Sequence, residues 1–296
     1  MAMTIAVSKE AKHYKSEITP DWCPGCGDYG VLTVLQRACA ELNIPNHEIL
    51  LVSGIGCSSN IPGFFKSYGV HSLHGRALPV ATGAKLANHS MTVIAAGGDG
   101  DGYGIGQGHF IHAMRRNIDL TYIVMNNEIY GLTTGQTSPT SETNMKTKST
   151  PFGNLEGQLN PLALAIAAGC GFVARGFSGD INHLKTLYME AIKYPGFALV
   201  DVFSPCVTFN KQNTFGWFKE RVYKLEDVNH DASQLHSAME KTLEWGAKIP
   251  IGIFYKNPNP RVSLDRLDST LSGKPLAYQS IGVSKEIRKK LIEEYV

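Results

Sequence analysis

The fold of this chain is decided by the stretch TVIAAGGDGDG at residues 92–102. An apolar run leads here into a glycine-rich turn, and a second apolar run ends 25 residues beyond Gly100, just before the pair Asn126-Asn127. This order predicts a strand, a turn, a helix and a second strand. Glycines let backbone N–H groups approach a diphosphate at the start of a helix, where the helix dipole is positive. Asp99 and the side-chain oxygen of Asn127 can share one hard cation, so the stretch predicts a site for a metal-bridged diphosphate.

The six cysteines of the chain fall into two groups. Cys39 shares one face of an expected helix with apolar residues, and Cys170 ends an apolar run, so both are predicted to pack in the core. The others sit beside glycine or proline in expected turns, where a sulfur can point at a metal: Cys23, Cys26, Cys57 and Cys206. Four thiolates form a complete shell for zinc or for an iron–sulfur cluster.

A metal is a better prediction for these four cysteines than a pair of disulfides. Residues 1–18 carry lysines and glutamates and no apolar signal core, which indicates the reducing cytoplasm. Spacing alone leaves zinc and iron–sulfur equally open, because the paired CxxC of zinc ribbons is absent from the sequence. The GDG and NN pattern resembles the thiamine diphosphate motif, and reactions on that cofactor can release electrons, which a cluster accepts singly. The combination favours iron–sulfur.

Apolar strand runs alternate along the chain with segments of helical periodicity. This alternation predicts an α/β fold, with a mostly parallel sheet flanked by helices. Ligands of such sheets gather at the carboxyl ends of the strands. Strand runs at residues 49–52, 92–96, 122–125 and 198–202 are followed, in that order, by Cys57, Asp99, Asn127 and Cys206. One edge of one sheet is therefore expected to carry both predicted sites.

From about residue 21 to about residue 255, the sequence resembles the beta subunits of 2-oxoacid:ferredoxin oxidoreductases. The resemblance rests on separate blocks: WCPGCG at 22–27, SGIGCS at 53–58, HGRA at 74–77, GGDGDG at 97–102, NNEIYGLTTG at 126–135 and PC at 205–206. It implies the thiamine diphosphate-binding fold. We expect residues 1–256 to form one domain that binds thiamine diphosphate and the cluster, and residues 257–296 to form an extended C-terminal tail.

The resemblance also implies which residues bind each cofactor. One [4Fe-4S] cluster is expected on Cys23, Cys26, Cys57 and Cys206, and Mg²⁺ on Asp99, Asn127 and the backbone carbonyl of Ile129. Thiamine diphosphate is expected to contact a further set, Ile55, Gly56, Cys57, Ser58, His74, Gly100, Asp101, Gly131 and Leu132. The residue types themselves leave two alternatives open. His74 could instead hydrogen-bond a loop, and Asp101 could be a turn or helix-capping residue.

The implied activity is the oxidative decarboxylation of a 2-oxoacid to acyl-CoA, with electrons passing through the cluster to ferredoxin. No side chain of this chain is expected to act as a catalytic acid or base, because the cofactor carries that chemistry. In the family, the glutamate that activates the cofactor is provided by the alpha subunit. The implied partners are therefore that larger alpha subunit, in a heterodimer, together with ferredoxin, coenzyme A and the 2-oxoacid.

The substrate is predicted from two positions. At Leu132 the sequence resembles relatives that also have leucine there and that accept 2-oxoglutarate or a range of 2-oxoacids. Asn60 stands at a position where some broad-range relatives carry lysine. We predict 2-oxoglutarate, with its distal carboxylate bound by the alpha subunit, and keep pyruvate and branched-chain 2-oxoacids as alternatives. The rival class is a non-redox thiamine diphosphate decarboxylase or carboligase subunit, whose cysteines would hold structural zinc.

Composition argues against two other classes of protein. The chain has 296 residues, is 43% hydrophobic and carries a formal charge of +2 without a clustered lysine and arginine stripe, so nucleic acid binding is not expected. The sequence has no apolar run of about 18 residues, so a membrane-spanning helix is not expected. The polar loop at residues 132–159 is interpreted either as a lid or partner contact or as a mobile surface loop. A charged helix is expected at residues 284–295.

Overall fold

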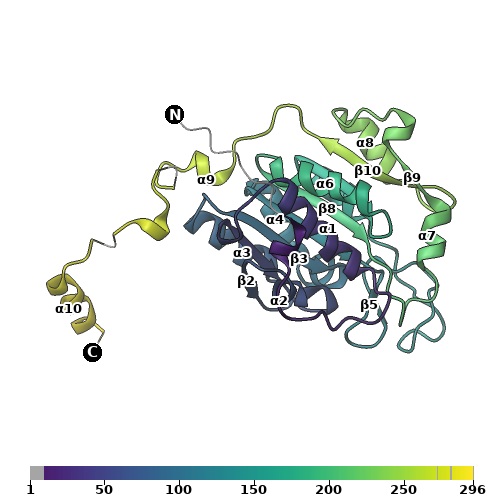
Figure 1. Ribbon diagram of the computed structural model, residues 1–296, viewed down its shortest axis with the longest axis horizontal. Helices are drawn as coiled ribbons and strands as arrows, with labels where there is room; N and C mark the ends of the chain where they lie inside the picture. Colours follow the sequence, from purple (N-terminus) through teal and green to yellow (C-terminus); the bar gives the residue numbers. More distant parts are fainter. Residues whose placement is uncertain (1–9, 272, 281, 296) are drawn as a thin grey trace.

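An eight-stranded sheet forms the centre of the computed structural model, which describes residues 10–271, 273–280 and 282–295 (Figure 1). The strand order is β2-β1-β3-β4-β8-β7-β10-β9. The strands are β1 (Ile49–Ser53), β2 (Tyr68–His71), β3 (Thr92–Gly98), β4 (Leu120–Asn126), β7 (Phe172–Phe177), β8 (Phe197–Phe203), β9 (Val222–Lys224) and β10 (Ile249–Lys256). Neighbouring strands are parallel except β7 and β10, which are antiparallel. The predicted α/β class with a mostly parallel sheet is confirmed.

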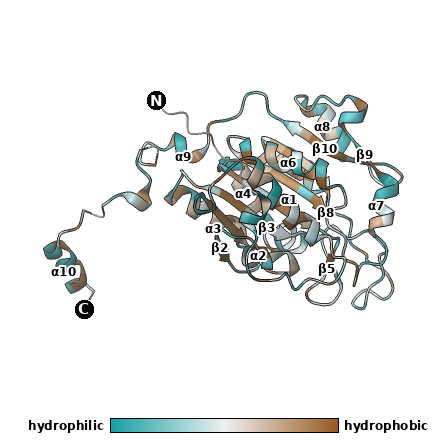
Figure 2. Cartoon of the chain, in the orientation of Figure 1, coloured by the Kyte–Doolittle hydropathy of each residue, from teal (hydrophilic) through white to brown (hydrophobic). Residues whose placement is uncertain are grey.

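Helices cover both faces of this sheet, as the continuous apolar strand runs require. α1 (Asp28–Glu41) and α6 (Ile181–Lys193) pack on one face, and α3 (Ala77–Ala87), α4 (Gln107–Arg116), α5 (Pro161–Ala167) and α8 (Leu235–Thr242) pack on the other. Successive strand residues point to opposite faces, so Leu51 joins the core under α1 and Val52 the core under α3. The central strands are accordingly the most hydrophobic part of the chain (Figure 2).

Shorter elements complete the fold. The remaining α-helices are α2 (Ile61–Phe64), α7 (Phe215–Arg221), α9 (Leu264–Leu267) and α10 (Lys285–Glu293), and β5 (Ile129–Tyr130) pairs with β6 (Gln136–Thr137). Single helical turns are η1 (Ala11–Tyr14), η2 (Asn46–Glu48), η3 (Cys57–Asn60), η5 (Glu226–Val228) and η6 (Leu276–Tyr278). The strand β2 has no counterpart in the apolar runs of the sequence, because all of its residues are exposed at the sheet edge.

The two cysteines predicted to pack in the core do so. Cys39 is fully buried on α1, and Cys170 is 1% exposed at the turn before β7. Burial raises the pKa of each thiol to about 12, so both stay protonated at neutral pH. These two cysteines are therefore small apolar side chains of the core and take no part in the site.

The C-terminal segment leaves the body of the molecule after β10 (Figure 1). Its first part is attached: the Arg261 guanidinium donates to the carbonyls of Met114 and Gly169, at 3.0 and 3.1 Å. Further on, α10 lies away from the sheet and has no buried residue. The proposed division of the chain at residue 256 stays a prediction. No helix in the described ranges is long and apolar enough to span a membrane.

Candidate active site

The carboxyl ends of four neighbouring parallel strands meet at one edge of the sheet. β1, β3, β4 and β8 lie side by side in that order, and the loops that follow them carry Cys57, Asp99, Asn127 and Cys206. This is the edge at which parallel sheets bind their ligands. The juxtaposition expected from the order of the sequence is thus present in the fold.

A cavity of about 90 Å³ lies among these loops. It is lined by Ile55, Gly56, Cys57, Ser58, His74, Gly98, Asp99, Gly100, Asp101, Asn127, Ile129, Tyr130, Gly131, Leu132 and Thr133. Every residue that the sequence assigned to thiamine diphosphate or Mg²⁺ is in this set. Gly98, Tyr130 and Thr133 join them without having been assigned, although all three lie inside the blocks of the motif. The cavity therefore gathers the predicted residues, while their binding roles stay predictions.

The glycine turn at the cavity is a π-helix, residues Gly100–Ile105, and α4 begins only at Gln107. A Cβ added to Gly100 would lie 2.1 Å from the Tyr130 ring, and one added to Gly102 would lie 2.0 Å from the Tyr122 hydroxyl. Both glycines are thus required by close packing of the turn against aromatic side chains of other elements. The sequence predicted a simple turn here, and π-helical turns are frequent at functional sites.

Asp101 organises the wall of the cavity. Its buried Oδ1 accepts hydrogen bonds from His74 Nδ1 at 2.7 Å, from the Ile55 N–H at 2.9 Å and from the Gly75 N–H at 2.7 Å. The carboxylate therefore joins the loop after β1 to the loop before α3. A Cβ on Gly54 would lie 1.9 Å from Asp101 Oδ2, so only glycine fits there. Asp101 is neither a solvent-facing cap nor a simple turn residue.

Asp99 is held from the opposite side by the polar loop. Its Oδ2 accepts hydrogen bonds from the hydroxyls of Ser138 and Thr140, the latter at 2.7 Å. Burial raises the pKa of this carboxyl to about 6, and the two hydroxyls oppose the rise. Asn127 lies beside it and accepts from the Ile129 N–H at 3.1 Å. The hydroxyls of Ser138 and Thr140 were missed by sequence reasoning, because the loop has no periodic pattern.

Acidic side chains outnumber basic ones beneath the cavity. Asp99, Glu128 and Asp201 are buried there, and Arg175 pairs with Asp201 at 3.1 Å between Nε and Oδ2. Burial raises the pKa of Glu128 well above its usual range, and neither of its carboxyl oxygens has a hydrogen-bond partner. Glu128 also has a positive φ of 57°, a strained conformation for a side chain of its kind. Of these three acids, Asp99 alone lines the cavity, whereas Glu128 favours its protonated form and Asp201 is paired with Arg175.

Three loops that carry the four turn cysteines are bonded to one another. The Gly27 N–H donates to the Pro205 carbonyl at 3.1 Å, which ties the CxxC loop to the loop after β8. The indole N–H of Trp22 donates to the Cys57 carbonyl at 2.6 Å, which ties it to the loop after β1. Segments far apart in the sequence are thereby fixed next to each other.

The sulfurs of Cys57 and Cys206 both lie close to Gly131. A Cβ placed on Gly131 would lie 3.6 Å from Cys206 Sγ and 3.7 Å from Cys57 Sγ. Burial, together with smaller contributions from charges on Asp28, Cys206 and Cys23, raises the pKa of Cys57 to about 11. Burial likewise raises the pKa of Cys26, with contributions from Asp28, Cys206 and Cys57. Each cysteine of the set is thus close to another.

These sulfurs do not close around a single ion. Within the described ranges, no group of three or more histidine, cysteine, aspartate or glutamate side chains is arranged to hold one metal ion. A single zinc would require all four sulfurs within about 2.3 Å of one point. A [4Fe-4S] cluster needs the same four sulfurs around a larger group of atoms. Four thiols on three loops that are bonded to one another are the donor set that such a cluster takes, and the cluster on these cysteines stays a prediction.

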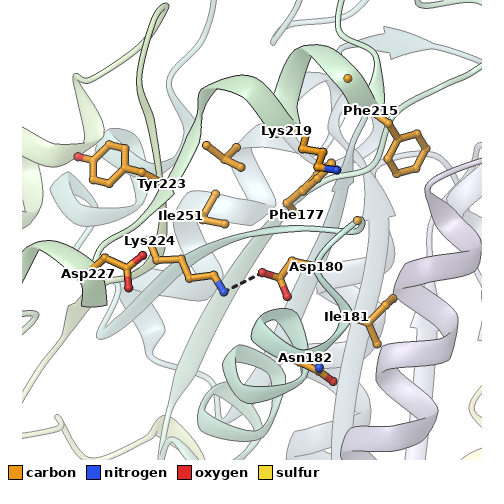
Figure 3. A pocket seen from close by; sticks show the side chains of 13 residues that line it. Phe177, Asp180, Ile181, Asn182, Phe215, Lys219, Tyr223, Lys224, Asp227 and Ile251 are labelled. Atoms are coloured by element: carbon orange, nitrogen blue, oxygen red, sulfur yellow. Dashed lines mark ion pairs between the residues drawn. The ribbon is translucent and has the colours of Figure 1, made fainter.

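The other cavities described here contain none of the predicted cofactor ligands, although one of about 190 Å³ is lined by Glu128, Thr140 and Arg175. A cavity of about 660 Å³ is formed by α7, β9 and the start of α6, with Lys224 and Asp180 paired at 2.8 Å (Figure 3). It is larger than the site cavity, but no predicted ligand lines it. Asn60, which entered the substrate prediction, lies in a separate hollow beside Asp21 and not in the site cavity.

Comparison with known proteins agrees with this geometry. The family model of the thiamine pyrophosphate enzyme C-terminal TPP binding domain matches residues 54–202. The family model of the C-terminal part of the pyruvate ferredoxin oxidoreductase beta subunit matches residues 206–270. The first of these matches supports thiamine diphosphate as the ligand of the chain.

Two archaeal relatives are closely similar. The beta subunit of 2-oxoacid:ferredoxin oxidoreductase 1 from Aeropyrum pernix is 48% identical over 85% of this chain and 82% of its own length. The 2-oxoacid:ferredoxin oxidoreductase subunit beta from Saccharolobus solfataricus is 51% identical over 80% of this chain and 82% of its own length.

A solved structure is similar over nearly the whole length. It is the 2-oxoglutarate:ferredoxin oxidoreductase from Magnetococcus marinus with 2-oxoglutarate, coenzyme A and succinyl-CoA bound, and it is 42% identical with a TM-score of 0.85 over 95% of each chain. Fold, site and relatives agree. The chain belongs to the family of beta subunits of 2-oxoacid:ferredoxin oxidoreductases.

Proposed function

We propose that this beta subunit binds thiamine diphosphate with Mg²⁺ in the cavity at the sheet edge and one [4Fe-4S] cluster on Cys23, Cys26, Cys57 and Cys206. With an alpha subunit, it would oxidise a 2-oxoacid to acyl-CoA and CO₂ and pass the electrons to ferredoxin. The observation that carries the proposal is the position of Cys57, which lines the cavity and also belongs to the group of four cysteines. Two cofactors that share one residue are close enough for direct electron transfer.

The Mg²⁺ ligands are proposed to be Asp99, Asn127 and the carbonyl of Ile129. They are hard oxygen donors on one wall of the cavity, of the type that Mg²⁺ prefers. The buried Asp99 carboxyl, whose pKa is raised to about 6, gains a partner when a cation binds. The diphosphate would then lie against the backbone of Gly100 and beside His74, whose ring is fixed by Asp101.

When bound, thiamine diphosphate supplies the electron sink for loss of CO₂ from the 2-oxoacid. The residues of this chain hold that cofactor in place. Asp101 fixes His74 and the loop with Ile55, and Ser138 and Thr140 fix Asp99. None of the side chains that line the cavity is assigned an acid or base role, so we expect the beta chain alone to be inactive and the pair with an alpha subunit to turn over.

The substrate is proposed to be 2-oxoglutarate. The support is the presence of Leu132 at the cavity, with the similarity to proteins named as 2-oxoglutarate enzymes, including the subunit KorB from Mycobacterium tuberculosis, which is 45% identical over 68% of this chain. Initial rates with 2-oxoglutarate, pyruvate and a branched-chain 2-oxoacid, each with coenzyme A and ferredoxin, test this. A higher kcat/KM for pyruvate would contradict it.

The decisive experiment is metal analysis of the heterodimer, coexpressed and purified without oxygen. We expect about four iron and four sulfide per beta chain, and a reduced-state EPR signal that develops on addition of 2-oxoacid and coenzyme A. One zinc and no iron would overturn the cluster and the electron path, and would support a non-redox thiamine diphosphate enzyme.

A further inference from the structure

A buried amide, Asn210, joins the loop of Cys206 to the loop of Asn127. It is 1% exposed and lies four residues beyond Cys206, in the loop that follows β8. Its side-chain Nδ2 donates to the Asn127 carbonyl at 3.0 Å, and its backbone N–H donates to the Cys206 carbonyl at 3.2 Å. One residue therefore bonds both to a proposed ligand of the cluster and to a proposed ligand of Mg²⁺.

Both ends of the Asn210 amide are occupied. Its Oδ1 accepts from the backbone N–H groups of Gln212 at 3.0 Å and Asn213 at 2.9 Å, which closes an Asx turn. Its Nδ2 donates to Asn213 Oδ1 at 3.2 Å as well as to the Asn127 carbonyl. Only one orientation of the amide satisfies all four bonds, because the oxygen must face the two N–H groups. The turn after Cys206 thus fixes the group that bonds Asn127.

The loop of Asn127 is held at this point from outside the cavity. β4 ends at Asn126, whose carbonyl accepts from the Ser204 N–H at 2.9 Å, so Asn127 is the first residue beyond the strand. The chain then turns through Glu128, whose φ is 57°. Asn127 lines the cavity, whereas Asn210 is not among the lining residues. The Asn210 amide can therefore set the position of Asn127 without touching a ligand in the cavity.

Loss of this bond has a definite cost at the Asn127 carbonyl. A buried carbonyl that loses its donor loses the energy of the bond and is left without a partner. The carbonyl and the side chain of Asn127 belong to one residue, so a shift of the first moves the second. Outer partners that orient metal ligands in this way typically contribute about 10–100-fold in metal affinity.

We propose that Asn210 is a positioning residue, which holds Asn127 in place for Mg²⁺ and makes the cation site depend on the loop that carries Cys206. The inference rests on the proposed function, because it requires Asn127 to be a ligand of Mg²⁺. No bond to the cation is made by Asn210 itself. Its effect is on the geometry of Asn127.

The test is a calorimetric titration of the anaerobic heterodimer with Mg²⁺ at a fixed concentration of thiamine diphosphate. Asn210→Asp keeps an oxygen for the two N–H groups of the turn and replaces the donor to Asn127 with a second oxygen. We expect the Mg²⁺ concentration for half-saturation to rise about 10–100-fold. Excess Mg²⁺ should restore the binding of thiamine diphosphate. A folded variant with the wild-type half-saturation, or one that excess Mg²⁺ does not restore, would overturn the inference.

Asn117→Asp is the matched control. Asn117 is 4% exposed, its Oδ1 accepts from the Phe197 N–H at 3.1 Å, and its Nδ2 donates to the Arg261 carbonyl at 2.7 Å. Phe197 is the first residue of β8, so this bond lies at the opposite end of that strand from the site. The control should melt lower than the wild type but keep its Mg²⁺ half-saturation. An equal rise in both variants would make the role of Asn210 purely structural and overturn the inference.

A second variant covers the case in which Asn210→Asp does not fold. Asn210→Ser retains a hydroxyl that can accept from the turn, but its side chain is too short to bond the Asn127 carbonyl. The same rise in Mg²⁺ half-saturation is expected for it. Failure of both variants to fold would assign Asn210 to the fold alone and overturn the inference. A wild type that binds no thiamine diphosphate with Mg²⁺ would instead refute the proposed function.

Discussion

Asp99 and Asp101 are only two residues apart in the sequence, but their carboxylates make different contacts. Asp101 Oδ1 is occupied by three donors of the protein, whereas Asp99 Oδ2 takes two hydroxyls and the residue lies with Asn127 on the cavity wall. Asp101 therefore shapes the site, and Asp99 is the carboxylate that we propose as a ligand of the cation.

Removing the charge of Asp101 should weaken the binding of thiamine diphosphate, because Asp101 holds other residues of the cavity in place. In Asp101→Asn the three donors to Oδ1 lose their charged acceptor, so the His74 ring and the loop of Ile55 are held less firmly. Residues that orient ligands in this way typically contribute about 10–100-fold in affinity. We expect a loss of that size in thiamine diphosphate affinity, measured by calorimetry with Mg²⁺ present. Exposed Glu240→Gln is the control, and equal affinity in both variants would contradict the prediction.

The raised pKa of Asp99 predicts a pH dependence. The usual value is 3.8 and the folded value is about 6, so the unfolded chain ionises first and the contribution of Asp99 to stability falls as pH rises through this window. A bound cation needs the ionised form, so Mg²⁺ with thiamine diphosphate should raise the melting temperature more at pH 7.5 than at pH 5. Asp99→Asn should abolish this difference. A ligand effect that is equal at both pH values would contradict the role of Asp99.

At the scale of elements, the π-helix of residues 100–105 depends on its glycines. A Cβ at Gly100 or Gly102 would clash with an aromatic side chain of a neighbouring element. The π-helix packs closely against β4 and β5, and Asp99 and Asp101 at its start both line the cavity. The polar loop around residues 138–141 closes the same region through its hydroxyls. This part of the loop is a support for Asp99.

Two glycines, one in the turn and one in the next helix, give a matched test. A Cβ in Gly102→Ala would meet the buried Tyr122 hydroxyl, and such overpacking costs about 1–3 kcal/mol. For Gly108→Ala nothing lies within 4 Å of the new Cβ, and alanine favours a helix by up to about 1 kcal/mol. We expect the first variant to melt lower than the wild type and the second to melt equally or higher in thermal scans. The opposite order would show that the turn can shift away from Tyr122.

At the scale of the whole molecule, the C-terminal segment lies outside the sheet, and its two parts differ in how they are attached (Figure 1). The first part of the C-terminal segment is anchored through Arg261, whose carbonyl also accepts a hydrogen bond of 2.7 Å from Asn117, and through the buried Asp265. The helix α10, which the sequence predicted at residues 284–295, is exposed throughout.

Truncation should separate these two parts. Deletion of residues 258–296 removes four hydrogen bonds of Arg261 and should cost about 4 kcal/mol at about 1 kcal/mol each. Deletion of residues 273–296 should change the melting temperature little, since only exposed contacts are lost. Arg261→Ala should fall between them, and exposed Arg266→Ala should match the wild type. Equal melting temperatures for both truncations would show that the anchored part contributes nothing.

Much of this architecture could be predicted from the sequence, for physical reasons. The apolar runs predicted β1, β3, β4 and β8 because these strands are buried on both faces, and the glycine and cysteine blocks predicted the loops at their ends. β2 was missed because its exposed residues give no apolar signal. Ser138 and Thr140 were missed because each acts through a contact between distant segments, which local patterns do not record.

The sheet topology decides when, during synthesis, the four cysteines can come together. About 180 residues separate Cys26 from Cys206, which takes roughly 10–40 s of synthesis at about 5–20 residues per second. β8 lies between β4 and β7 in the middle of the sheet, so the edge that gathers the thiols cannot close before β8 has been made. Until then, the thiols of Cys23 and Cys26 lack the rest of the site around them. Any group that takes all four sulfurs must therefore be inserted into a chain that is at least two-thirds complete.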